Sequence, residues 1–77
     1  MTIRGFEIMM LLRNKPYVEL AIELGVSRQI VSMWGKSRKV PKNRLEEIAG
    51  ILNCPVEYLN GEVDVEMLAD ELDKYIF

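Results

Sequence analysis

Residues 17–36 read YVELAIELGVSRQIVSMWGK. Its first half keeps the i, i+3, i+4, i+7 spacing of one helix face with Tyr17, Leu20, Ala21 and Leu24. The pattern predicts a helix over residues 16–24, and Gly25 fits the left-handed position that ends it. Ser27 is a good N-cap for a second helix over residues 27–34. Two short helices joined by a tight turn that contains glycine predict a helix-turn-helix unit.

The second helix of this unit is expected to have two faces. Ile30, Val31 and Trp34 are predicted to turn inward, and the apolar side chain of Val26 is predicted to pack in the turn before them. The polar or long side chains left to face outward are Arg28, Gln29, Ser32 and Met33.

The rest of the chain shows no strand-like alternation and predicts further helices. They are expected over residues 3–13, from 42 or 43 to 52, and over 55–59, with Pro16, Pro55 and the Asn60-Gly61 turn between or after them. Asp64 is a candidate N-cap for a sixth, amphipathic helix. The sequence therefore predicts an all-α fold.

Composition excludes several classes of protein. The 77 residues fit one domain, and the 49% hydrophobic content suffices for a compact core. With no histidine and with Cys54 as the one cysteine, the chain has no internal disulfide and no Cys/His zinc site. Neither a signal peptide nor a membrane-spanning stretch is evident, because the longest apolar run is residues 8–12. We expect a cytoplasmic protein without cofactor, metal or catalytic activity.

The net charge of −2 hides a strong segregation of charge along the chain. Residues 28–44 hold basic side chains and no acidic one, namely Arg28, Lys36, Arg38, Lys39, Lys42 and Arg44. The segment from residue 57 onward has Lys74 against the acidic residues Glu57, Glu62, Asp64, Glu66, Asp70, Glu71 and Asp73. Such asymmetry indicates nucleic-acid contact by the basic part, although an ordinary solvated surface would give the same pattern.

Residues 17–36 resemble the helix-turn-helix of the Cro/C1-type (XRE) repressor family. The positions that carry this resemblance are the small residue Ala21, the turn glycine Gly25 and the apolar residues Val26, Val31 and Trp34. The run from Leu20 to Arg28 and the segments 34–41, 45–49 and 56–59 are also similar to the family, so the resemblance covers about residues 6–61. The chain departs from the family at Tyr17, where glutamine is common, and at Pro16, where a Ser or Thr cap is usual. It also departs at Gly35 and Ser37, which stand where glutamate and glycine are usual.

The resemblance implies a five-helix, lambda-repressor-like DNA-binding domain over residues 1–61. The apolar stripe and acidic residues that follow predict an acidic amphipathic helix over residues 62–77. The resemblance also implies a transcriptional regulator, expected to be a repressor of phage or mobile-element type, that inserts the helix at 27–34 into the major groove of double-stranded DNA. The expected base contacts are Arg28, Gln29, Ser32 and Met33. The expected phosphate contacts are Tyr17, Ser27, Lys36, Ser37, Arg38, Lys39, Lys42, Asn43 and Arg44.

The C-terminal apolar stripe has two interpretations: it folds back onto its own domain, or it pairs with a second copy. We expect a homodimer on a palindromic operator, because one such unit covers only a short half-site. The residues expected at its interface are Tyr58, Val65, Leu68, Leu72 and Ile76. Without an effector domain, regulation would come from protein concentration or from a protein partner such as an anti-repressor or a toxin.

Two alternatives stay open. An antitoxin or a restriction-modification controller would use the same DNA-binding mode. A protein-protein adaptor, with the acidic tail as its docking helix, would not bind DNA.

Overall fold

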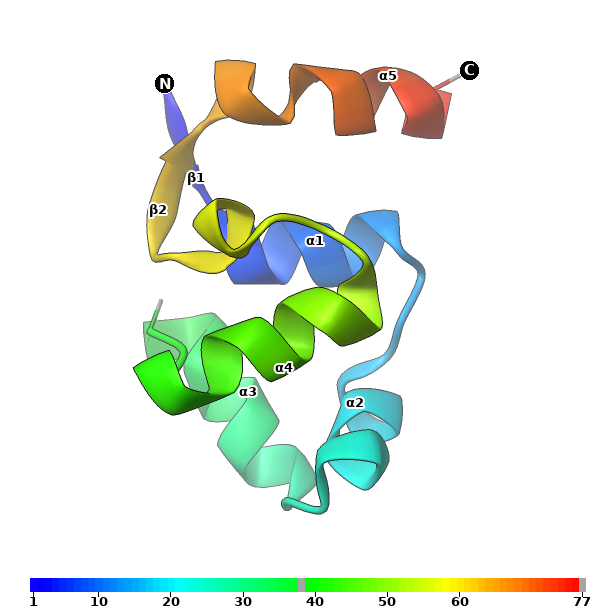
Figure 1. Cartoon of the computed structure of the whole chain (residues 1–77), viewed down its shortest axis with the longest axis vertical. Coiled ribbons are helices and arrows are strands. Elements are labelled where there is room, and N and C mark those ends of the chain that lie inside the picture. The colour runs from blue at the N-terminus through cyan, green and yellow to red at the C-terminus, as the bar shows by residue number, and fades with distance from the viewer. Residues whose placement is uncertain (38, 77) are drawn as a thin grey trace.

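The computed structural model describes residues 1–37 and 39–76, and their side chains apart from those of Ser37, Tyr75 and Ile76 (Figure 1). Its α-helices are α1 (Gly5–Leu12), α2 (Tyr17–Leu24), α3 (Arg28–Ser37), α4 (Lys42–Leu52) and α5 (Ala69–Ile76). Two 3-10 helices, η1 (Val56–Leu59) and η2 (Val65–Leu68), and two short strands, β1 (Thr2–Arg4) and β2 (Glu62–Asp64), complete the described chain. The predicted helices over 16–24, 42–52 and 55–59 are thus confirmed within one residue at each end.

The apolar faces of α1 to α4 meet in one core, which η1, β2 and η2 close from the other side. Its most completely buried side chains are Met9, Leu20, Val31, Ile48, Leu52, Leu59 and Leu68. Burial of such side chains is the main favourable term in folding a chain of this size.

The all-α expectation is wrong at the two ends of the domain. Residues 2–4 are extended and pair antiparallel with residues 62–64, with Ile3 opposite Val63, so the first helix begins at Gly5 and not at residue 3. The peptide N–H of Val65 also donates to the carbonyl of Met1 at 3.0 Å. Each strand has three residues, and about sixty residues separate the two strands along the chain. The sequence therefore has no repeating pattern from which this pairing could be predicted.

Helix α3 is longer than predicted, and the predicted inward orientation of one of its side chains is wrong. The helix continues through Gly35 to Ser37 instead of ending at residue 34. Ile30, predicted to turn inward, is 41% exposed. The buried face is narrower than the apolar pattern suggested, because Val31, Trp34 and the buried Gly35 already fill it.

The C-terminal segment folds back onto its own domain. Asp64 is the N-cap of η2, since its carboxylate accepts from the N–H of Glu66 at 3.2 Å, as predicted. Leu68 is fully buried in the core of its own domain, and Leu72 packs partly buried against the same core. Helix α5 lies over α1, at the end of the molecule opposite the turn between α2 and α3 (Figure 1).

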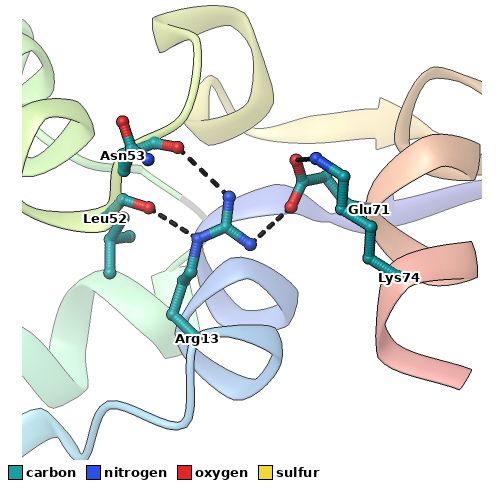
Figure 2. Close-up of polar contacts among 5 residues, drawn as sticks. All are labelled: Arg13, Leu52, Asn53, Glu71 and Lys74. Atoms are coloured by element: carbon teal, nitrogen blue, oxygen red, sulfur yellow. Dashed lines mark hydrogen bonds and ion pairs between the residues drawn. The ribbon is translucent and has the colours of Figure 1, made fainter. Parts of the chain in front are cut away.

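One arginine holds three helices together at this end. The guanidinium of Arg13, just after α1, donates to the carbonyls of Leu52 at 2.7 Å and Asn53 at 3.1 Å, where α4 ends. It also pairs with the carboxylate of Glu71 in α5, whose other oxygen lies 3.8 Å from the ammonium of Lys74 (Figure 2). Arg13 therefore satisfies free carbonyls at a helix C-terminus and fixes α5 in place.

Candidate nucleic-acid interface

The turn between α2 and α3 is fixed by its backbone. Gly25 adopts a φ of 71° and ends α2, and the N–H of Val26 donates to the carbonyl of Ala21 at 3.0 Å. Ser27 then caps α3, because its hydroxyl oxygen accepts from the N–H of Ile30 at 3.2 Å. The predicted cap and left-handed glycine are both confirmed, and they set the angle at which α3 leaves α2.

The inner face of α3 is locked against the rest of the domain. Val31 is fully buried and Trp34 nearly so. The rings of Phe6 in α1 and Trp34 pack edge to face, with centroids 6.4 Å apart. Because this packing fixes the rotation of α3 about its axis, it also fixes which side chains face outward.

The outward face of α3 carries the side chains expected to contact bases. Arg28, Gln29 and Met33 are exposed, and Ser32 is half-buried. They form one wall of an open hollow of about 470 Å³ whose other wall is the start of α2. The residues that line it are Pro16, Tyr17, Val18, Arg28, Gln29, Ser32, Met33 and Lys36. The structure thus brings the four expected base-contacting residues together at one site.

Tyr17 joins this site to the core. Its ring stacks on Phe6, with centroids 6.0 Å apart, and burial raises the pKa of its hydroxyl. The hydroxyl lies over Gly35 so closely that a Cβ atom added there would be 2.5 Å from it. Tyr17 is therefore a packing residue whose edge also lines the hollow.

The other side chains expected at phosphates lie in the hollow, in the segment after α3 and at the start of α4. Lys36, Lys39, Lys42 and Asn43 are exposed. Arg44 is half-buried and pairs with Glu47 at 3.0 Å, a partial neutralisation that the sequence did not indicate. Ser27 is exposed but its hydroxyl is occupied as the helix cap. Arg38 and the side chain of Ser37 lie outside the described residues.

Two residues that line the hollow, Pro16 and Val18, were not predicted as site residues. Val18 is 48% exposed and lies outside the apolar face of α2, so helical periodicity gave it no role. Its signal was an apolar residue at a position where that period predicts a polar one.

The residues expected at a dimer interface are only partly on the surface. Tyr58 and Val65 are half-buried, as is Leu72, while the side chain of Ile76 lies outside the described residues. Exposed apolar surface near them includes Met67, which is 44% exposed.

Three further observations concern metal binding, thiol chemistry and membrane spans in the described part of the chain. No group of three His, Cys, Asp or Glu side chains there is placed to hold a metal ion. Burial raises the pKa of the Cys54 thiol to about 11, so this group stays protonated at neutral pH. No helix among the described residues is long and apolar enough to cross a membrane.

Comparison with known proteins gives no family assignment, since no family model, curated protein or solved structure matches this chain.

Proposed function

We propose that this protein is a sequence-specific, double-stranded DNA-binding transcriptional regulator of the cytoplasm, a repressor of phage or mobile-element type. One observation carries the proposal. Helix α3 has a locked inner face and presents Arg28, Gln29 and Met33 to solvent on its outer face. Among the described residues, those that line the adjoining hollow include two cations and no acid.

In the proposed complex, α3 lies in the major groove, which is about 12 Å wide and admits one helix. The guanidinium of Arg28 donates to O6 and N7 of guanine, and the amide of Gln29 donates to N7 and accepts from N6 of adenine. Lys36, Lys39 and Lys42 meet phosphates on either side, which supplies affinity that falls with salt but carries no sequence choice.

We also propose that two copies bind together. A helix of ten residues is about 15 Å long and can read only a few base pairs. Two copies on half-sites about 34 Å apart would extend the recognised sequence across one helical turn. Sedimentation of the protein with and without the selected DNA measures this stoichiometry directly.

The experiment that tests the proposal is selection of bound sites from random duplex DNA, followed by titration of the selected site. Arg28→Ala and Gln29→Ala should each weaken binding by about 1–3 kcal/mol and relax the preference at one base pair. The matched control is Asn60→Ala, an exposed amide outside the hollow, which should bind like wild type.

Two results would contradict the proposal. Unchanged affinity in both variants would remove α3 from the interface. Absence of salt-dependent binding to any duplex would exclude DNA binding altogether and would favour the protein-protein adaptor.

A further inference from the structure

Two exposed apolar side chains line the hollow between α2 and α3. Ion pairs and hydrogen bonds with a ligand would not give these side chains a role. Val18 in α2 and Met33 in α3 line the hollow and leave 48% and 63% of their surfaces exposed. They come from different helices, and the turn at Gly25 and the packing of Val31 hold those helices in a fixed relation. Exposed apolar side chains gathered within one concave site indicate a ligand with an apolar group of its own.

The surroundings of these two side chains restrict what that ligand can be. Arg28 and Lys36 line the same hollow, and no acidic residue is among its described lining, so the ligand is anionic. Gln29, also in the lining, presents an amide that matches the edge of adenine. An anionic polymer that offers hydrogen-bonding edges and a small apolar group together is duplex DNA, whose major groove exposes the C5-methyl group of thymine.

We propose that Val18 and Met33 form a recognition surface for the C5-methyl group of thymine, beside the base read by Gln29. The inference rests on the proposed function and deepens it, because it names an A·T-containing step as the preferred DNA at this site. Gln29 and the Val18–Met33 surface can contact the same base pair, since an A·T pair presents adenine N6 and N7 and the thymine methyl on the same groove edge. Val18 thereby becomes a specificity-determining residue, supplied by α2 and not by α3.

The test replaces each thymine of the selected site by deoxyuridine, one position at a time. This change removes only the methyl group and keeps the pairing and the O4 acceptor. At one position in each half-site, wild type should bind about fourfold more weakly, the factor that burial of one methyl group contributes. At the other thymines the two duplexes should bind alike.

Protein variants connect this effect to the two side chains. In Met33→Ala, and to a smaller degree in Val18→Ala, the ratio between thymine and deoxyuridine should fall toward one. Ile22→Ala is the matched control, because Ile22 is an apolar residue of α2 that is 76% exposed and does not line the hollow. It should keep the full fourfold ratio, and circular dichroism of each variant shows that the fold is retained.

The inference is overturned if deoxyuridine is tolerated at every position, or if its effect persists unchanged in both variants. Either result with Arg28-dependent binding intact would leave the proposed function standing and remove only the methyl contact. A protein that binds no duplex at all would overturn both.

Discussion

At the scale of single residues, the side chain of Tyr17 in α2 contacts Gly35 in α3. The Tyr17 hydroxyl lies directly over Gly35. A side chain at position 35 would compete with the tyrosine for this space. The ring at the start of α2 and the glycine in α3 thus fit together, and a larger residue at position 35 would have to displace the Tyr17 hydroxyl.

Gly5 gives the first stability prediction. A Cβ atom at this position would lie 1.8 Å from the carbonyl oxygen of Tyr58, and the Gly5 N–H donates to the carbonyl of Gly61 at 3.0 Å. Because backbone cannot move aside as a flexible side chain can, Gly5→Ala should destabilise the fold by about 3 kcal/mol. Urea unfolding followed by circular dichroism measures this change.

Gly50 provides the matched control for Gly5. It lies within α4, and an added Cβ atom would meet nothing within 4 Å. Gly50→Ala should therefore stabilise the protein by about 0.5–1 kcal/mol, since alanine loses less backbone entropy in a helix. Equal stabilities of the two variants would show that α1 and η1 are not in close contact.

At the scale of elements, the sequence predicts helices, whose apolar residues recur with a regular period. It does not predict contacts between residues that are far apart in the chain. Helices α2 and α4 follow from apolar spacing, and α2 also from Pro16 and Gly25 at its ends. The β1–β2 pair and the Arg13–Glu71 contact join residues about sixty apart, and no local pattern encodes them. In the site, polar outward residues of α3 were predictable from the helix period, whereas Val18 required knowledge of how α2 meets α3.

The Arg13–Glu71 pair predicts a pH dependence that is localised to α5. The hydrogen bond from Arg13 and the positive charge of Arg13 lower the pKa of Glu71 below the ordinary value of 4.5. The ionised form is thus favoured in the folded state, so the pair's stabilisation is present above pH 4.5 and is lost as pH falls through the lowered pKa. Glu71→Gln should cost about 1 kcal/mol at pH 7 and almost nothing once Glu71 is protonated in wild type.

Hydrogen exchange of the α5 amides, followed from pH 7 downward until Glu71 is protonated and corrected for the intrinsic exchange rate at each pH, measures this change locally. Asp73→Asn is the control, because it removes an exposed carboxylate from the same helix. If exchange in α5 responds equally to both substitutions, the pair does not hold the helix.

The burial of Leu68 predicts that the C-terminal segment contributes to the stability of the fold. The side chain of Leu68 is fully buried, so Leu68→Ala should leave a cavity and cost about 2–5 kcal/mol. Met67→Ala, at a neighbouring position that is 44% exposed, should cost much less. Thermal unfolding distinguishes the two, and a mild effect of Leu68→Ala together with a changed oligomeric state would instead assign this side chain to an interface between copies.

At the scale of the whole molecule, the acidic helix α5 and the turn between α2 and α3 lie at opposite ends (Figure 1). Helix α5 lies across α1 (Figure 1), whereas the exposed residues Lys36, Lys39 and Lys42 belong to α3, to the segment after it and to the start of α4, in a molecule 32 Å long. At physiological salt, charges separated by more than about 8 Å are largely screened. The carboxylates of α5 should therefore have little influence on a polyanion bound at α3.

This separation gives the last prediction, which concerns the salt dependence of binding. Lys36→Ala should reduce the slope of log K against log salt by about 1, equally on selected and random DNA, because one phosphate contact is lost. Asp70→Asn combined with Asp73→Asn changes the net charge by two units yet should leave both slope and affinity unchanged at 0.15 M salt, about the physiological value. If neutralising these carboxylates strengthens binding several-fold, α5 lies close to the DNA, and the surface that contacts it is not centred on α3.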